Sequence, residues 1–325
     1  MTSTHIRQIG QLAVPQPLTS KGRELSLAPD AFGELRRSDE IRGDTDALRA
    51  RLAEDGYLFL PQLLDRDLVL AARRVMCQQL ADLGLLDPRY PVEDAVVSPE
   101  PGAADRLPGI MDRNTLVKAN APLGELLYAG RMLAFYEQLF RGPVTHFDYT
   151  WTRIVKPGGA TPAHYDIVFM SRGTHDLVTA WTPLGDVDVQ LGGLMILEGS
   201  HRIDELRNGY GQSDVDTVCA NRFDGAWLAP DGTRNRPADA TGMLSDDHVM
   251  LQQRYGGRWL TAEFRAGDLL TFGMYTLHAS IDNRTSRWRL STDSRYQLTA
   301  EPVDHRWMGE EPIGHGPSSA RGVIC

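Results

Sequence analysis

The sequence predicts a mainly β protein with helices in its N-terminal part, an α+β chain whose core is an antiparallel barrel or sandwich. Residues 44–142 contain segments in which apolar residues recur at helical spacing. After residue 143 the chain forms short runs rich in β-branched and aromatic residues, separated by Gly and Pro. Helical segments do not alternate with these runs, so a parallel α/β sheet is not expected.

The expected organisation is one folding unit preceded by an arm. Residues 1–43 are mixed and polar with several prolines, and they predict an extended N-terminal arm. Residues 44–325 are then expected to form a single domain. Its parts are a helical region at 44–142, a β core at 143–300 that contains an insertion at 203–257, and a C-terminal tail at 301–325.

Three helices and one strand are expected before the β core. They are predicted at 44–56, 65–84 and 124–142, with the strand at 57–61 and a loop-like stretch at 85–115. The first helix begins with an Asp-Thr pair and ends at Gly56. The second helix is amphipathic, and Gly84 is expected to cap it because glycine readily adopts the left-handed conformation there.

The β core is expected to consist of short strands with turns between them. These strands are predicted at 144–159, 176–184, 192–200, 258–264, 268–280 and 287–298. The insertion at 203–257 is longer than an ordinary hairpin loop and carries Tyr210 and Trp227. Two interpretations are open, a passive surface insertion and a lid that covers the mouth of the core.

Composition excludes several classes of protein. The chain has 325 residues, of which 42% are hydrophobic and 24% charged, as in an ordinary globular protein. A net charge of −9 argues against a general nucleic-acid or anionic-membrane surface. Cys77, Cys219 and Cys325 are far apart and form no CxxC motif, and no apolar run resembles a signal peptide or a membrane span. We therefore expect a cytoplasmic protein.

Two His-x-Asp triplets, His146–Asp148 and His164–Asp166, are candidate metal ligands. On a strand such a triplet places both side chains on one face, because side chains alternate. Two imidazole nitrogens and one carboxylate oxygen form the facial triad of a non-heme iron site, which leaves coordination positions open. Either triplet would need a second histidine from a distant strand, and an isolated triplet is more often structural.

The segment after residue 265 supplies such a histidine and a candidate anion-binding arginine. His278 precedes Arg289 by one short turn, so the two residues could lie on paired strands with both side chains inside. A buried arginine needs an anionic partner, and a guanidinium suits a carboxylate. That partner could be a dicarboxylate ligand, with Ser291 donating a further hydrogen bond, or one of the many aspartates in an internal salt bridge.

These motifs together resemble the phytanoyl-CoA dioxygenase family of iron(II)- and 2-oxoglutarate-dependent oxygenases. The resemblance extends from about residue 44 to residue 300. It rests on LAEDGYLFLPQLLDRDLVLAARR (52–74), TRIVKPGGATPAHYD (152–166), AWTPLGDVDVQLGGLMILEGSHR (180–202) and AGDLLTFGMYTLHASIDNRTSRWRLS (266–291). It implies a double-stranded β-helix core, that is, a cupin-like jelly roll.

The resemblance also implies roles for individual residues. The iron ligands would be His164, Asp166 and His278, since His164 follows the KPGG turn as the family pattern requires. Arg289 would bind the distal carboxylate of 2-oxoglutarate with help from Ser291. Trp181 would line the cosubstrate pocket, and Arg153 would face the same pocket.

The implied activity is that of a dioxygenase with iron(II), 2-oxoglutarate and O2. It would hydroxylate an unactivated C–H bond of a small metabolite or natural-product intermediate and release succinate and CO2. Desaturation, ring closure or epimerisation with the same cofactors is an alternative outcome. A metal-dependent jelly-roll enzyme that does not use 2-oxoglutarate and a non-catalytic binding module are alternative classes. The expected partner is a small-molecule substrate, without nucleic acid or membrane, and the oligomeric state is left open.

Overall fold

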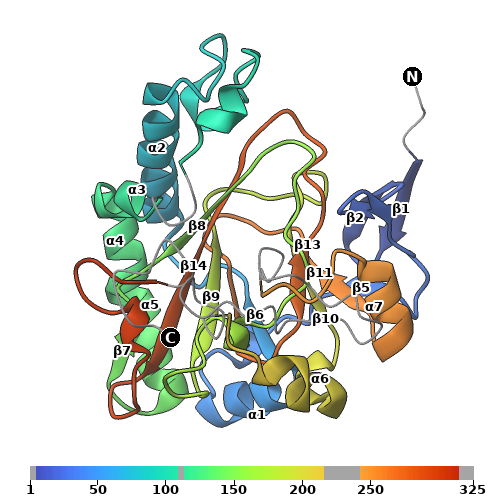
Figure 1. Cartoon of the computed structure of the whole chain (residues 1–325), viewed down its shortest axis with the longest axis vertical. Coiled ribbons are helices and arrows are strands. Elements are labelled where there is room, and N and C mark those ends of the chain that lie inside the picture. Colours follow the sequence, from blue (N-terminus) through green and yellow to red (C-terminus); the bar gives the residue numbers. More distant parts are fainter. Residues whose placement is uncertain (1–4, 109–112, 216–241, 315–325) are drawn as a thin grey trace, which may run out of the picture.

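Two mainly antiparallel sheets form the centre of the computed structural model (Figure 1), which describes residues 5–108, 113–215 and 242–314. The larger sheet has the strand order β6-β12-β9-β14-β7, and β8 also pairs with β14. Its strands are β6 (Tyr57–Leu60), β7 (Val144–His146), β8 (Trp151–Val155), β9 (Val178–Pro183), β12 (Leu269–Gly273) and β14 (Arg289–Leu298). The smaller sheet, in the order β13-β10-β11-β5, contains β5 (Phe32–Glu34), β10 (Leu194–Leu197), β11 (Trp259–Thr261) and β13 (His278–Ser280).

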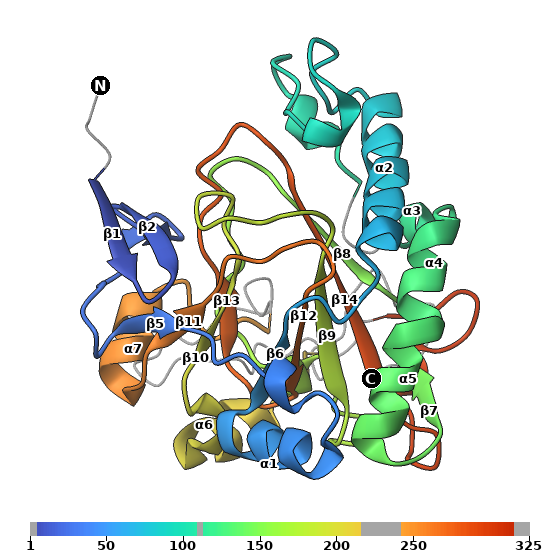
Figure 2. The ribbon, with the colours of Figure 1, turned by 180° about the vertical axis from the view of Figure 1, so that it is seen from behind.

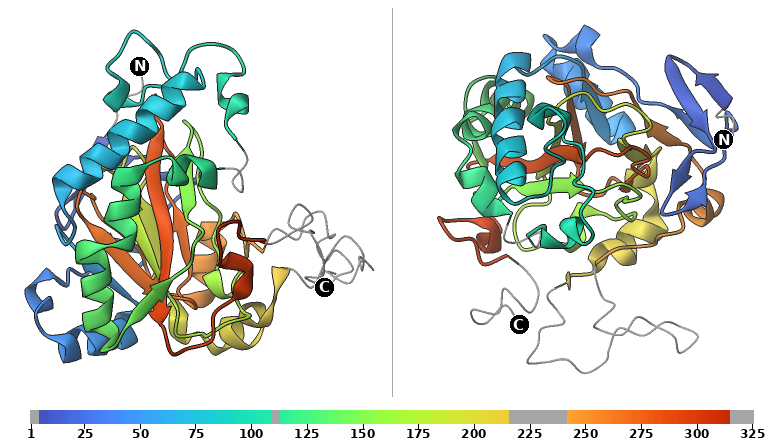
Figure 3. Two further views of the ribbon diagram at one scale, coloured as in Figure 1. Left: turned by 90° about the vertical axis from the view of Figure 1, so that its left-hand side faces the viewer. Right: turned by 90° about the horizontal axis from the view of Figure 1, so that it is seen from above.

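Helices cover the outer face of the larger sheet (Figure 3). They are α1 (Thr45–Asp55), α2 (Arg66–Asp82), α3 (Asn114–Lys118), α4 (Ala121–Tyr128) and α5 (Gly130–Phe140). Leu290 and Tyr296 of β14 are part of the core formed with these helices. Since side chains alternate along a strand, Arg289, Ser291 and the odd-numbered residues that follow them point the other way, toward the smaller sheet.

The first two predicted helices begin and end close to the expected residues. The Asp44 side chain caps α1 by accepting a hydrogen bond from the Ala47 amide, and Asp65 caps α2 in the same way. The single helix expected at 124–142 is instead two helices, α4 and α5. The chain breaks at Ala129, which is extended at φ −147° and ψ −177°. Apolar periodicity continues across the break, so the sequence pattern did not reveal it.

Two predicted strands are also divided. The run at 144–159 forms β7 and β8, with residues 147–150 between them. The run at 268–280 forms β12 in the larger sheet and β13 in the smaller sheet. The chain therefore crosses from one sheet to the other within this run. The mainly β core with N-terminal helices is as predicted, and the described strands form two sheets instead of a closed barrel.

The N-terminal segment packs against the core (Figure 2). It forms two small antiparallel pairs, β1 (His5–Ile9) with β2 (Leu12–Gln16) and β3 (Thr19–Ser20) with β4 (Arg23–Glu24). Leu12, Val14 and Leu18 are buried, and β5 pairs in parallel with β11. The segment therefore supplies a strand and buried side chains to the core.

The insertion at 203–257 is described at its two ends. They contain α6 (Asp204–Asn208) and α7 (His248–Tyr255), and Leu206 and Leu251 are buried in the core. Residues 216–241, which include Trp227, lie outside the described residues, so the lid hypothesis stays a prediction. Within the described ranges, no helix has both the length and the apolar character that crossing a membrane requires.

Candidate metal centre

Three buried side chains from two separate segments of the chain converge between the two sheets. They are His164, Asp166 and His278, and one ligand atom from each lies within 4.8 Å of the others. The Nε2 atoms of both histidines lie 3.8 Å from Oδ1 of Asp166. No other group of three potential metal ligands occurs in the described part of the chain.

Backbone hydrogen bonds place the two histidines side by side. The His164 amide donates to the His278 carbonyl at 3.0 Å, and the reverse bond is 3.2 Å long. Each Nδ1 atom faces a carbonyl oxygen, that of Pro162 at 2.9 Å for His164 and that of Thr276 at 3.0 Å for His278. Because a carbonyl only accepts, each Nδ1 carries the proton and each Nε2 lone pair is available to a metal.

Asp166 lies outside any regular strand, unlike the prediction from His-x-Asp spacing. It begins a short 3-10 helix (Asp166–Val168), while His164 forms an isolated bridge with His278. The two side chains still converge, because the turn carries the carboxylate toward the imidazoles. The reasoning about a shared strand face was therefore wrong, although the residues it selected are together.

Electrostatics favour an ionised carboxylate and two neutral imidazoles. Burial lowers the pKa of both His164 and His278, and each imidazole thus stays neutral. Burial alone would raise the pKa of Asp166, but the positive charge of Arg295, together with the hydrogen bond from Thr179, holds it well below its usual range. Two neutral nitrogen donors and one carboxylate oxygen fit an iron(II) ion with open coordination positions.

Arg289 is a buried cation without an acidic partner. It is 1% exposed, and no described carboxylate lies within salt-bridge distance of it. Its Nη1 donates to the Ser291 hydroxyl at 3.4 Å, and its Nε has no partner. Burial lowers the pKa of Arg289 to about 10. The described residues provide no internal salt bridge, so the guanidinium still requires an anion.

His278 and Arg289 face one small cavity from different sheets. The cavity is also lined by His164, Trp181 and Arg153. The expectation that His278 and Arg289 lie on paired strands is wrong, because β13 and β14 belong to the smaller and the larger sheet. Opposing sheets achieve the same result as paired strands would, since both side chains point between them.

Trp181 and Arg153 also line this cavity. The Trp181 indole is buried, and its Nε1 has no hydrogen-bond partner among the described residues. The Arg153 Nε lies 2.6 Å from Oδ2 of Asp293, so its charge is already paired. Trp181 can therefore donate to a ligand, and Arg153 differs from Arg289 in having an internal partner.

The second triplet has different surroundings. His146 Nδ1 lies 3.8 Å from Asp148 Oδ1, and both side chains are partly exposed. No described third ligand accompanies them. The choice of His164 and Asp166 over this pair agrees with the geometry.

Sequence reasoning missed three polar residues around the centre. Thr179 and Arg295 contact Asp166, and Asp293 contacts Arg153. A signal was present, because Arg289, Ser291, Asp293 and Arg295 recur at every second position. That spacing places all four on one face of a strand, where an inward polar row is unusual.

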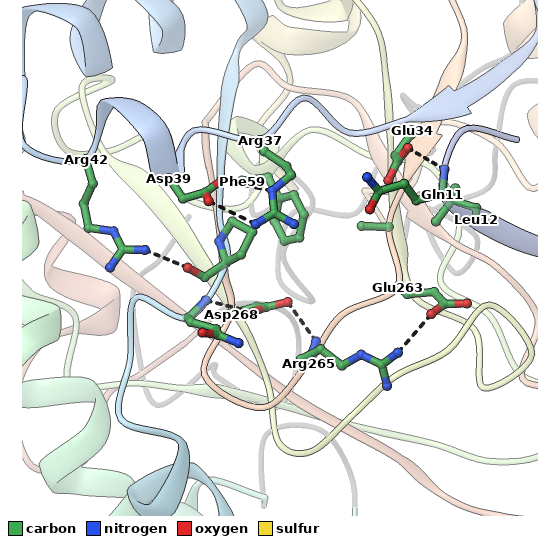
Figure 4. Close-up of a pocket in the computed structure, with 13 residues that line it drawn as sticks. Gln11, Leu12, Glu34, Arg37, Asp39, Arg42, Phe59, Glu263, Arg265 and Asp268 are labelled. Atoms are coloured by element: carbon green, nitrogen blue, oxygen red, sulfur yellow. Dashed lines mark hydrogen bonds and ion pairs between the residues drawn. The ribbon is translucent and has the colours of Figure 1, made fainter.

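A larger cavity of about 390 Å³ lies elsewhere, beside β5, β6 and the turn before β12 (Figure 4). Its charged side chains are largely satisfied by one another. Arg37 pairs with Asp39, and Arg265 pairs with Glu263. None of the predicted site residues lines it, so size alone does not identify the functional site.

Comparisons with known proteins agree with this geometry. The sequence pattern of the phytanoyl-CoA dioxygenase (PhyH) family matches residues 52–291. The chain belongs to this family. It is 26% identical over 288 residues to 1-deoxypentalenic acid 11-beta-hydroxylase of Streptomyces exfoliatus, which covers 86% of this chain and 88% of that protein.

Solved structures share the fold of this PhyH family member. EctD from S. alaskensis in its apoform is 17% identical, with a TM-score of 0.51, over 93% of this chain and 99% of that one. EctD with 2-oxoglutarate and 5-hydroxyectoine is 16% identical, with a TM-score of 0.50, over 91% of each chain. The predicted double-stranded β-helix core, a cupin-like fold, is confirmed. The described strands do not form a closed barrel.

Family membership establishes the class of enzyme. This PhyH family chain is an iron(II)- and 2-oxoglutarate-dependent dioxygenase, an oxidoreductase that uses O2 and acts on a small molecule. The predicted cofactors are thereby confirmed.

Proposed function

We propose that His164, Asp166 and His278 hold iron(II) and that Arg289, assisted by Ser291, binds the distal carboxylate of 2-oxoglutarate. One observation supports this assignment above all. Two histidines of a buried metal-ligand cluster, His164 and His278, line the same cavity as the buried, unpaired guanidinium of Arg289. A dicarboxylate with a metal-binding 2-oxo acid end would satisfy both groups at once.

In this assignment the metal and the residues that hold it have separate roles. When bound, iron(II) supplies the activation of O2 that couples conversion of 2-oxoglutarate into succinate and CO2 to oxidation of a C–H bond. The two histidines offer neutral Nε2 atoms, and Asp166 offers a carboxylate that stays ionised. The site is nearly inaccessible to solvent, which protects a reactive centre from water.

Trp181 and Arg153 contribute to the cosubstrate pocket. The unpaired Trp181 Nε1 is a donor available to a carboxylate. Arg153 adds positive charge beside His164 while Asp293 fixes its position. Their effect on 2-oxoglutarate affinity should be smaller than that of Arg289, because only Arg289 is a fully unpaired cation.

The prime substrate is proposed to be a natural-product intermediate with an unactivated C–H bond, which the enzyme hydroxylates. The similarity to 1-deoxypentalenic acid 11-beta-hydroxylase favours hydroxylation of a small molecule. A net charge of −9 argues against a strongly anionic carrier such as a coenzyme A thioester. Cytoplasmic location and the absence of nucleic-acid and membrane partners stay predictions.

The test measures succinate released with a panel of such intermediates, with and without iron(II) and 2-oxoglutarate. Omitting either should abolish succinate formation, and His164→Ala should do the same. His146→Ala is the matched control, since it alters the other His-x-Asp triplet and should retain activity. Turnover without 2-oxoglutarate, or an active His164→Ala enzyme, would contradict the assignment. Incorporation of ¹⁸O from labelled O2 into the product separates hydroxylation from desaturation or epimerisation.

A further inference from the structure

The two carboxylate oxygens of Asp166 have different surroundings. Oδ2 accepts a hydrogen bond from the Thr179 hydroxyl and lies 3.0 Å from Nη2 of Arg295. Oδ1 faces the other way and lies 3.8 Å from Nε2 of each of His164 and His278. Thr179 and Arg295 therefore both contact Oδ2, whereas Oδ1 faces the space between the two imidazoles.

The two residues that contact Oδ2 lie directly opposite each other in the larger sheet. Thr179 of β9 and Arg295 of β14 are partners in the antiparallel register. Opposed residues in such a pair share one face of the sheet, so the hydroxyl and the guanidinium reach into the same space. Asp166 comes from a separate turn and meets both donors there.

Arg295 is held in place by contacts of its own. Its side chain is 1% exposed, and its guanidinium carbon lies 4.6 Å from the centre of the Trp151 ring. Its Nη1 donates to the Ser294 carbonyl at 3.3 Å. A buried guanidinium fixed by an aromatic face and a carbonyl cannot swing away from the carboxylate without losing these contacts.

We propose that Arg295 and Thr179 are positioning residues that hold Oδ2 away from the metal, so that Asp166 binds the ion through Oδ1 alone. This inference rests on the proposed function, because it presupposes a metal between the two imidazoles. A carboxylate that binds through one oxygen occupies one coordination position, which keeps the remaining positions open for 2-oxoglutarate and O2. Hydrogen-bonded partners of this kind fix the orientation of a metal ligand and thereby raise metal affinity.

The experiment measures the dissociation constant of Mn(II), from the EPR signal of the free ion, for the full chain without 2-oxoglutarate. Thr179→Val removes the hydroxyl, whereas Thr179→Ser keeps it. Thr182→Val is the matched control, because this buried threonine on the same strand faces away from Asp166 and its hydroxyl has no described partner. Arg295→Met removes the guanidinium and keeps an unbranched apolar chain.

Thr179→Val and Arg295→Met should weaken Mn(II) binding about 10- to 100-fold, the usual effect of losing such a partner. Thr179→Ser and Thr182→Val should bind like the unaltered protein. Equal affinity in Thr179→Val and Thr182→Val would overturn the inference, even if Arg295→Met did not fold.

A crystal structure of the unaltered, Mn(II)-loaded protein provides a second readout that needs no variant. One metal–Oδ1 bond, with Oδ2 still on Thr179 and Arg295, is expected. Chelation through both oxygens would overturn the inference and leave the proposed function intact. Failure of the unaltered protein to bind Mn(II) or iron(II) at these residues would instead contradict the proposed function.

Discussion

Arg153 and Asp293 form a buried ion pair, with Nε of the arginine 2.6 Å from Oδ2 of the aspartate. The other oxygen of Asp293 has no hydrogen-bond partner among the described residues. Arg289 lines the same cavity. Arg153 thus has an acidic partner and Arg289 has none among the described residues, so the cavity keeps one positive charge in excess for an anionic ligand.

Asp293→Asn should destabilise the ligand-free protein and increase its response to 2-oxoglutarate. The substitution leaves the buried Arg153 without its acidic partner, which costs about 3–5 kcal/mol for a buried pair that loses one partner. A bound dianion would offset this cost. The unfolding midpoint with and without 2-oxoglutarate measures the effect in the Mn(II)-loaded protein. The exposed Asp188→Asn is the control, and an equal ligand-induced shift in both variants would contradict the prediction.

Arg289→Leu should separate binding from stability. Replacing a buried and unpaired charge with an apolar side chain removes a desolvation cost, so the ligand-free protein should unfold at the same temperature as the unaltered protein or higher. The dissociation constant for 2-oxoglutarate should rise about 10- to 100-fold through loss of a charged hydrogen bond. Calorimetry measures both quantities. Arg287→Leu, at a partly exposed arginine, should leave binding unchanged, and a strong loss of stability in Arg289→Leu would contradict the explanation.

His248→Gln should reduce the sensitivity of the protein to acid. The imidazole is buried, and burial lowers its pKa from 6.5 to about 4. Below pH 6.5 the unfolded chain therefore takes up a proton that the folded protein does not, and folding stability falls between pH 6.5 and about 4. The full loss is about 3 kcal/mol.

Urea unfolding at pH 7 and pH 4.5 measures this loss. The histidines of the metal centre also have lowered pKa values, so the comparison is between His248→Gln and the unaltered protein. The variant should lose less stability on acidification. The same loss in both proteins would show that His248 is not responsible.

Gly192→Ala should be far more destabilising than Gly199→Ala. Both glycines have positive φ, 86° and 72°, so each substitution costs about 1–2 kcal/mol in backbone strain. A Cβ atom on Gly192 would lie 2.5 Å from the Ile281 carbonyl oxygen, whereas nothing lies within 4 Å at Gly199. The Gly192 variant should therefore lose more than about 3 kcal/mol. Equal losses in denaturant unfolding would contradict the role of this close contact.

The sequence predicted what depends on short-range pattern and on the family motifs. Helix starts at Asp44 and Asp65 follow from capping, and His164, Asp166 and His278 follow from the motif. Contacts that depend on pairing between strands were not predictable. The meeting of Thr179 with Arg295 requires the register of β9 against β14, which no local pattern contains.

The same limit explains the misplaced elements. Apolar, β-branched and aromatic residues continue through 268–280, so the sequence predicts one strand. The crossing between sheets depends on the strands with which β12 and β13 pair. Phe272 of β12 lies opposite Thr179 of β9, and His278 of β13 lies opposite Ile196 of β10. Tertiary pairing overrides a local pattern that is equally compatible with a continuous strand.

Under the proposed assignment of residues, this crossing would let the cosubstrate link the two sheets. His278 belongs to the smaller sheet and Arg289 to the larger one. A 2-oxoglutarate molecule bound both to Arg289 and to a metal held by His278 would therefore connect the two sheets. Its binding should restrict motion of one sheet relative to the other, because sliding of the sheets would break the contacts of the ligand on one side. Amide hydrogen exchange in β13 and β14 should therefore slow in concert when 2-oxoglutarate and the metal are both present, and neither strand should respond fully to one alone.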